Sequence, residues 1–149
     1  MDKKRLFKIM ANAGREEVAQ MAEKLKQNHD IVIIKEPSKT LTMIKMREPV
    51  KGSLFYIGEV IVTECIVELD GERGMAVTMG DDFEKTLDMS VIDAACNKGV
   101  FNDEDNLLEL EKNQILKLQR ENAMHLKTMV SFNSLDREAP KDVNAFKKT

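Results

Sequence analysis

The sequence predicts an α+β fold, with an antiparallel sheet of about four strands packed with helices and a long C-terminal helix suited to oligomerisation. Three observations predict this fold. Segments rich in β-branched residues alternate with turn residues. Apolar residues recur at helical spacing before and after these segments. The connections between the expected strands are mostly short turns, which join antiparallel neighbours.

Two short amphipathic helices are expected at the N-terminus. Gly14 separates them, and Glu16 and Glu17 lie in the first turn of the second helix, where the helix dipole favours negative charge. Their apolar positions are Leu6, Ile9, Met10 and Ala13 in the first helix, and Val18, Met21, Ala22 and Leu25 in the second.

Two strands are expected next. Residues 31–34 form a continuous β-branched run, as in a buried strand. Pro37-Ser38 predicts a turn, and residues 41–46 predict a second strand before the connection at 49–53.

The rest of the chain is expected to be organised around residues 55–95, and the first half of this stretch is predicted to form a β-hairpin. Both sides of its first strand are partly apolar, so we expect this strand to be central in the sheet, or covered on its second face by a helix or a partner. The two sides are Ile61, Thr63, Cys65, Val67 and Leu69, and Val60, Val62, Glu64, Ile66 and Glu68. Asp70-Gly71 predicts a tight turn, because glycine tolerates positive φ, and residues 73–79 return as the paired strand.

A capped helix is expected to follow the hairpin. Asp81, with Glu84 three residues later, can accept hydrogen bonds from the free N–H groups that open a helix. Gly99 is placed to end it. One apolar face is expected, made of Phe83, Leu87, Val91, Ala94 and Ala95.

A long final helix is expected over about 103–130, with Asn102 or Asp103 as its cap. At ~1.5 Å per residue it is roughly 40 Å long, more than a small sheet covers, so part of it is expected to meet another chain. The alternative is a helix folded wholly against its own sheet. The candidate partner-facing residues are Leu108, Ile115, Leu118, Leu126 and Met129. We expect one domain over 1–135 and a mobile polar tail over 136–149.

The composition is that of a cytoplasmic protein, with 149 residues and no apolar run that could span a bilayer. Cys65 and Cys96 form no C-x-x-C pair and are expected to be buried thiols, not a disulfide. The net charge of −3 is unevenly distributed: the first 56 residues are basic, and residues 57–111 are strongly acidic. This acidity argues against nucleic acid or an acidic membrane as a partner. The acidic segment is either a solvated face or a surface that docks on a basic partner.

The search for catalytic motifs finds no nucleophile elbow, no phosphate loop and no H-E-x-x-H pair. His29 and His125 lie far apart in the sequence and are expected at the surface or facing a partner, since zinc needs three or four converging ligands. Asp81 and Asp82 could form an acid/base pair or ligate magnesium, but helix capping alone explains a carboxylate at this place. No catalytic, cofactor-binding or metal-binding residue is therefore assigned.

An ordered set of motifs runs through most of residues 4–132. It comprises Gly58-Glu59-Val60-Ile61-Val62-Thr63-Glu64-Cys65, Val67, the Asp70-Gly71 turn, residues 75–77, Gly80-Asp81-Asp82, Val91-Ile92-Asp93-Ala94-Ala95, the N-terminal helical pair, residues 41–46 before the Gly52 turn, and residues 121–130. This set resembles the PhnG family of the carbon–phosphorus lyase system. The candidate motif or docking residues are Gly58, Glu59, Thr63, Gly80, Asp81 and Asp82.

The resemblance implies a required but non-catalytic subunit of a complex with PhnH-like, PhnI-like and PhnJ-like subunits and a PhnL-like protein. That complex transfers the ribose triphosphate of ATP to a phosphonate such as methylphosphonate and releases adenine. The resemblance also implies that this subunit binds no cofactor, and that ATP and Mg²⁺ bind at the partner that carries the chemistry. Fifteen acidic side chains against three basic ones in residues 57–111 fit that division.

This chain departs from the family pattern at two places. Thr40 or Leu41 stands where many relatives have glycine, which alters a turn, and Asp81 stands where they have a basic residue. The second departure weakens any phosphate site at the Gly80 loop. The alternatives are a stand-alone homodimeric binding or assembly factor, in which the final helix pairs with its own copy, and an enzyme that uses Glu59, Asp81 or Asp82.

Overall fold

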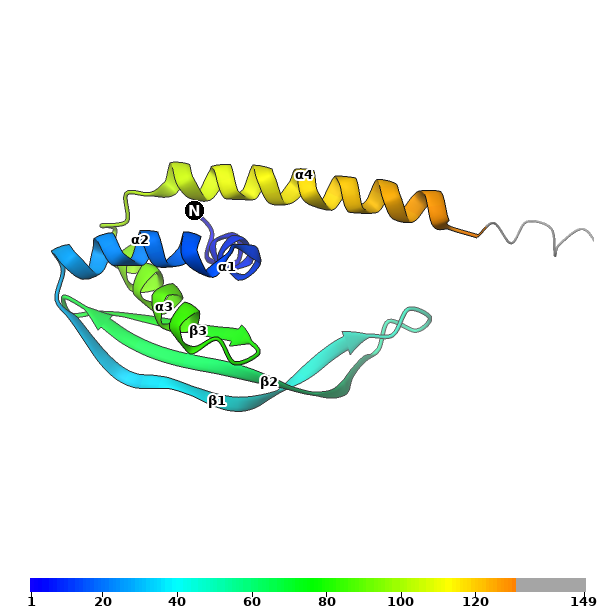
Figure 1. The fold of residues 1–149 in the computed structure, drawn as a ribbon. Coiled ribbons are helices and arrows are strands. Elements are labelled where there is room, and N and C mark those ends of the chain that lie inside the picture. The colour runs from blue at the N-terminus through cyan, green and yellow to red at the C-terminus, as the bar shows by residue number, and fades with distance from the viewer. Residues whose placement is uncertain (131–149) are drawn as a thin grey trace, which may run out of the picture. The chain divides into compact units, whose positions relative to one another are not determined.

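The computed structural model describes residues 1–130, and the tail expected at 136–149 lies outside them. The chain divides into two units, the first over residues 1–114 and the second beginning at Ile115. The element order is α1 (Lys3–Asn12), α2 (Arg15–Asn28), β1 (Ile31–Arg47), β2 (Leu54–Leu69), β3 (Glu72–Met79), α3 (Phe83–Lys98) and α4 (Glu104–Thr128) (Figure 1). The predicted α+β class and all four predicted helices are confirmed.

The sheet described by residues 1–130 has three antiparallel strands in the order β1-β2-β3, so the prediction of four strands was wrong. The two strands expected at 31–34 and 41–46 are one strand, β1. Pro37 does not turn the chain, because it lies where the β1–β2 register shifts, between Lys35 and Ser38. Proline is tolerated at a bulge of an edge strand, since no ladder hydrogen bond needs its missing N–H.

β2 is the central strand, as predicted, and one face of its C-terminal half is packed. Thr63, Cys65, Val67 and Leu69 are fully buried on that face. α3 covers this face of the sheet, and α1 and α2 pack beyond α3 (Figure 1). The core of the first unit therefore lies between one face of the sheet and the helices.

The predicted Asp70-Gly71 turn is confirmed, with φ of 46° at Asp70 and 91° at Gly71. The Asp70 carboxylate binds three groups: Lys98 Nζ at 3.0 Å, His29 Nδ1 at 2.7 Å and the backbone N–H of Asp30 at 2.9 Å. These contacts, the Lys98 hydrogen bond first, lower the pKa of Asp70 to about 2.

We expect Asp70→Asn to reduce the acid dependence of stability. The folded-state pKa of Asp70 lies below the usual value near 3.8, so its contribution is fully present above about pH 5 and is lost as the pH falls toward about 2. Asparagine keeps the left-handed conformation but not the charge. Urea unfolding of both proteins from pH 6 to pH 2 should show a stability difference that shrinks with acidification. A difference that stays constant or grows would contradict the assignment.

α3 is buried around most of its circumference, so the prediction of a single apolar face was wrong. The reason is that two of its carboxylates are buried, and cations from the N-terminal helices pair with them. Lys26 Nζ lies 2.6 Å from Asp88 Oδ1, and Lys3 Nζ lies 3.0 Å from Asp93 Oδ1. Gly99 ends the helix in the left-handed conformation, as predicted, with φ of 79°.

The N-terminal cap of α3 is Asp82 and not Asp81, so the predicted cap was off by one residue. Asp82 Oδ1 accepts a hydrogen bond of 3.0 Å from the backbone N–H of Lys85. Asp81 points elsewhere, to Lys39 Nζ at 3.2 Å.

Asp82→Ala is expected to lower the free energy of unfolding by about 1 kcal/mol, because it removes this cap. Asp81→Ala is the matched control. It removes an exposed ion pair and should cost less than about 0.5 kcal/mol. Equilibrium unfolding in urea compares the two, and equal losses would contradict the capping assignment.

The start of α4 is anchored within the first unit. Leu107 is fully buried, the Arg5 guanidinium makes a bidentate pair with Glu111, and Gln114 Nε2 donates to the Ile9 carbonyl at 2.9 Å. In the second unit, residues 115–130 carry exposed apolar side chains. Within residues 1–130, no helix combines the length and the apolar character that a membrane crossing requires.

Candidate functional site

The most unusual surface of the first unit is the outer half of the β1–β2 hairpin. We call residues 41–61 the arm: two strand segments, 41–47 and 54–61, and their connection. β3 ends opposite Val62, so the arm continues beyond it as a two-stranded ribbon. Figure 1 shows the arm projecting past β3 and α3. An isolated two-stranded ribbon is marginally stable in water, so the arm is unusual in having no third strand.

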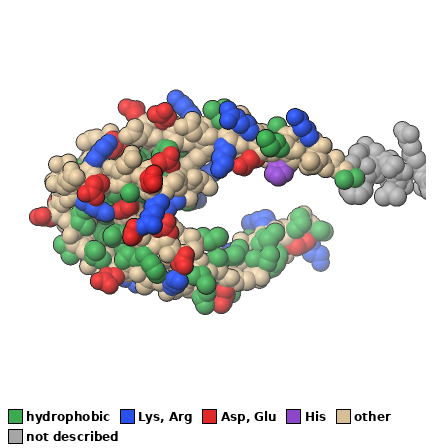
Figure 2. Space-filling view, in the orientation of Figure 1, with side chains coloured by type: hydrophobic (Ala, Val, Ile, Leu, Met, Phe, Trp, Pro, Cys, Tyr) green, Lys and Arg blue, Asp and Glu red, His purple; other side chains and the backbone are tan. Residues whose placement is uncertain are grey.

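Both faces of the arm carry apolar residues, and the large apolar side chains of its two strands are exposed. They are Leu41, Met43, Ile44, Met46, Leu54, Phe55, Tyr56, Ile57 and Ile61. Figure 2 shows hydrophobic side chains gathered along this ribbon. A contiguous exposed apolar surface of this kind marks an interaction site.

The register assigns these side chains to two faces, because directly opposed residues of a ladder point to the same side. On the side away from the helices lie Thr42 and Val60, Ile44 and Gly58, and Met46 and Phe55. No ionisable side chain occurs in these rows, and the next row, Thr40, Val62 and Met79, is also uncharged. We call this side of the arm the uncharged face.

The helix-side face of the arm mixes apolar and charged residues. Its rows are Leu41 and Ile61, Met43 and Glu59, Lys45 and Tyr56, and Arg47 and Leu54. Ile57 is the extra residue at the register shift. The Lys45 ammonium lies 5.9 Å from the centre of the Tyr56 ring, as expected for residues on one face.

Glu48 closes the arm's tip. Its carboxylate accepts hydrogen bonds from the backbone N–H groups of Val50 and Lys51, each at 2.9 Å. The negative charge of Glu48 is thus used inside the turn. Lys45, Arg47 and Lys51 leave the tip with an excess of positive charge.

The candidate motif residues fall into two groups. Thr63, Gly80, Asp81 and Asp82 meet at the β3–α3 junction, where Thr63 Oγ1 donates to the Gly80 carbonyl at 2.8 Å. Gly80 has φ of 94°. Gly58 and Glu59 lie four to five residues along β2 from Thr63, roughly 13–17 Å away, in the arm. The structure therefore does not join the six residues into one site.

The junction is tied together by contacts within the chain. Lys39 lies between Asp81, at 3.2 Å, and the Phe83 ring, whose centre is 5.8 Å from its Nζ. Arg15 pairs with Glu84, and its Nε lies 4.0 Å from Asp82 Oδ1. These contacts neutralise the carboxylates and cap the helix, which is a structural role.

Ion pairs within the chain also neutralise much of the acidic segment, residues 57–111. Nearly all ion pairs in residues 1–130 join a cation of the first 56 residues to a carboxylate of residues 57–111. The basic companion of the acidic segment is therefore, in large part, the chain's own N-terminal segment.

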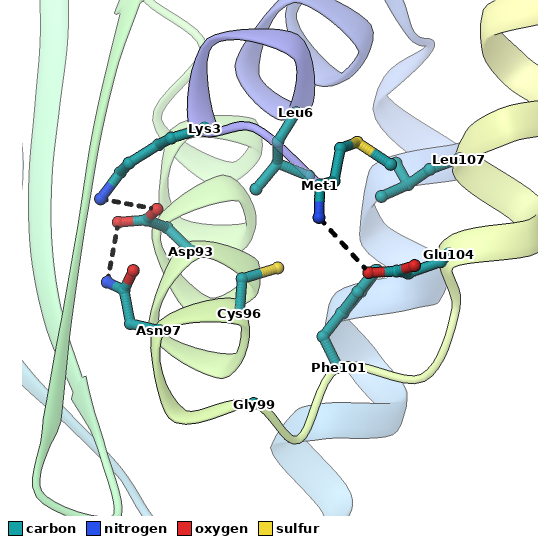
Figure 3. A pocket seen from close by; sticks show the side chains of 10 residues that line it. All are labelled: Met1, Lys3, Leu6, Asp93, Cys96, Asn97, Gly99, Phe101, Glu104 and Leu107. Atoms are coloured by element: carbon teal, nitrogen blue, oxygen red, sulfur yellow. Dashed lines mark hydrogen bonds and ion pairs between the residues drawn. The ribbon is translucent and has the colours of Figure 1, made fainter.

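A cavity of about 240 Å³ lies between α1, the C-terminal half of α3 and the start of α4 (Figure 3). Its charged groups form ion pairs, Lys3 with Asp93 and the N-terminal amine with Glu104. Asp93 binds Lys3, and Asp93 Oδ2 also accepts from the Met75 backbone N–H at 3.0 Å. The Cys96 thiol borders the cavity, and burial, with Asp93 and Glu104 nearby, raises its pKa to about 11. A protonated thiol is a poor nucleophile, so Cys96 is not activated for attack.

The remaining candidates are placed as follows. Cys65 and Cys96 are free thiols, as predicted, and burial raises the pKa of the Cys65 thiol too. His29 is the C-cap residue of α2, where its side chain is partly exposed and contacts Asp70. Among residues 1–130, no group of three histidine, cysteine or acidic side chains could hold a metal ion.

The candidate partner-facing helix residues are divided between the two units. Leu108 is half-buried in the first unit. Ile115, Leu118 and Leu126 are exposed on α4 in the second unit, and Met129, also exposed, follows the last residue of the helix.

A comparison with protein families identifies the chain. The sequence model of a family described as phosphonate metabolism protein PhnG matches residues 1–138. The chain belongs to the PhnG family. Membership gives it a role in phosphonate metabolism, as one subunit of a complex. None of the curated proteins compared with the chain matches it.

The PhnG match spans the residues of the arm, the junction and the start of α4. The sequence pattern of this PhnG chain does not reveal the arm, because Pro37-Ser38 indicates the end of a strand. The pattern that could have found it is the apolar character of 41–46 and 54–61 on both sides of a period-two repeat, with a turn between them.

Proposed function

We propose that this chain is a required, non-catalytic subunit of a cytoplasmic complex that transfers the ribose triphosphate of ATP to a phosphonate such as methylphosphonate and releases adenine. The observation that carries the proposal is an exposed apolar arm in a chain of the PhnG family. Such a surface fits a subunit that works when assembled. PhnI-like, PhnH-like and PhnJ-like subunits and a PhnL-like protein are the proposed partners, and ATP with Mg²⁺ binds on them.

Two of the three carboxylates that could act in catalysis have structural partners. Asp82 caps α3, and Asp81 pairs with Lys39. Two anionic substrates need cations, whereas the cations beside this junction, Arg15 and Lys39, are already bound to carboxylates. These contacts favour a supporting role over a direct one.

Reconstitution tests the proposal. Adenine release from ATP and phosphonate transfer are measured with the complete set of subunits, with this chain omitted, and with this chain alone. Omission is expected to abolish both activities, and the chain alone is expected to show neither. Turnover by the isolated chain, or full activity without it, would refute the proposal.

A triple variant, Glu59→Gln, Asp81→Asn and Asp82→Asn, separates the supporting role from the catalytic one. Asparagine caps helices as well as aspartate does, so α3 should be retained. The reconstituted complex is expected to keep its activity within about threefold, since an essential general base or acid contributes roughly a hundredfold or more. A loss of that size, with the assembly intact, would make these carboxylates catalytic.

A further inference from the structure

We propose that the arm inserts into a groove of another subunit that has one uncharged aliphatic wall and one acidic wall. This inference rests on the proposed function, because it names the surface through which the subunit assembles. It concerns residues 41–61 alone, and the other subunits supply the groove.

Both faces of the arm carry exposed apolar side chains that a partner would bury. Exposed apolar side chains occur on the uncharged face, as at Ile44 and Phe55, and on the helix-side face, as at Leu41 and Tyr56. A sheet with one solvated face alternates apolar and polar residues instead. A partner that covers one face would leave the other in water, so the occupant must enclose the ribbon.

The surface area of the arm also favours a partner that encloses both faces. Seven residues of strand extend about 24 Å, and two strands are about 10 Å wide. One face of the arm, treated as flat, therefore has an area on the order of 240 Å². A stable interface buries about 800 Å² on each partner. Contact on both faces and along the edges approaches that figure, whereas contact on one face is far below it.

The charges distinguish the two walls. The uncharged face has no ionisable side chain from the row of Met46 and Phe55 to the row of Thr40, Val62 and Met79. A charge opposite it would be buried without a counter-ion, so the wall there is uncharged. The helix-side face carries Lys45 and Arg47 near its tip and one carboxylate, Glu59, farther from it. Lys51 lies in the turn, and Glu48 is bound by the turn itself, so the tip keeps an excess of positive charge. Charge complementarity makes the second wall acidic.

A second copy of this chain fits less well. Two copies packed through their uncharged faces would leave both helix-side faces exposed. Pairing through the helix-side faces would bring Lys45 and Arg47 of each copy together, and the single Glu59 of this face can balance only one of these two cations. Like charges brought together in this way oppose association.

The test uses the full chain, tagged and co-purified with the other subunits, with affinities measured by titration. Ile44→Glu and Phe55→Glu place a charge on the uncharged face and are expected to weaken assembly at least about 100-fold. Lys45→Glu should weaken it about tenfold or more, increasingly at low salt, and Lys45→Arg should not. Val50→Gln is the control, since it changes an apolar turn residue outside both faces without adding a charge beside Lys51. It should assemble like the unmodified chain.

The outcomes distinguish the role of the arm in assembly from the proposed function of the chain. Thermal unfolding of each isolated variant should match the unmodified chain within a few degrees, because Ile44 and Phe55 are exposed. Assembly that tolerates all the substitutions overturns the arm's role and leaves the proposed function standing. An unmodified chain that binds no other subunit overturns both. A concentration-dependent dimer of the isolated chain that Ile44→Glu abolishes identifies the occupant as a second copy, and overturns the groove.

Discussion

Replacing Gly74 with alanine is expected to destabilise the protein by roughly 3 kcal/mol or more, or to prevent folding. Gly74 lies on β3 against α3, and a Cβ there would meet the Ser90 carbonyl oxygen at 2.2 Å and the Ala94 backbone nitrogen at 2.3 Å. Both are backbone atoms of α3, so no side-chain rotation relieves the clash. The helix would have to move away from the strand and expose part of the core.

Gly58→Ala is the matched control for Gly74→Ala, because both glycines lie in strands and have negative φ. No atom lies within 4 Å of the position where a Cβ at Gly58 would stand. The change should shift the free energy of unfolding by less than about 0.5 kcal/mol. Urea denaturation measures both variants, and a small loss for Gly74→Ala would mean that α3 does not pack closely on β3.

The parts of the fold that the sequence predicts are those decided by short-range chemistry. Asp70-Gly71 adopts positive φ at both residues and makes the expected hairpin turn. Gly99 ends α3, and α4 begins directly after Asp103. In each case a few neighbouring residues determine the conformation, so the local pattern was sufficient.

Where prediction failed, a distant residue decides the structure. Pro37 indicates a turn in isolation, but β1 runs through it because it is an edge strand paired with β2 on one side only. Asp88 and Asp93 make α3 look partly exposed in the sequence. Both are buried because cations from α2 and α1, which are distant in the sequence, pair with them.

The candidate site shows the same limit. The charge count along the chain correctly separates basic and acidic segments, but it does not reveal that Lys24 and Asp103, or Arg5 and Glu111, pair within the fold. Conversely, the apolar residues of 41–61 suggest burial, and nothing in the sequence shows that the rest of the chain leaves them uncovered. The exposure of these apolar residues in the structure is what identifies the arm.

Asp93→Ala is expected to cost about 2–3 kcal/mol, because the buried carboxylate bonds to a strand and to the N-terminal helix. Its Oδ2 accepts from the Met75 backbone N–H at 3.0 Å, and Lys3 Nζ lies 3.0 Å from its Oδ1. The Asp93 side chain is 1% exposed and Lys3 is 58% exposed. Most of the loss should therefore come from the unpaired N–H of Met75, and less than about 1 kcal/mol from the solvent-screened ion pair.

A double-mutant cycle separates these two contributions from Asp93. Asp93→Asn keeps an oxygen acceptor for Met75 and removes the charge, so it should cost less than Asp93→Ala. Lys3→Met should lose stability in the unmodified chain and almost none in the Asp93→Asn background, since no charge then needs a partner. Urea unfolding of the four proteins gives the coupling energy. A coupling energy of zero would mean that Lys3 does not compensate the Asp93 charge, and the carboxylate would then be held by the Met75 hydrogen bond alone.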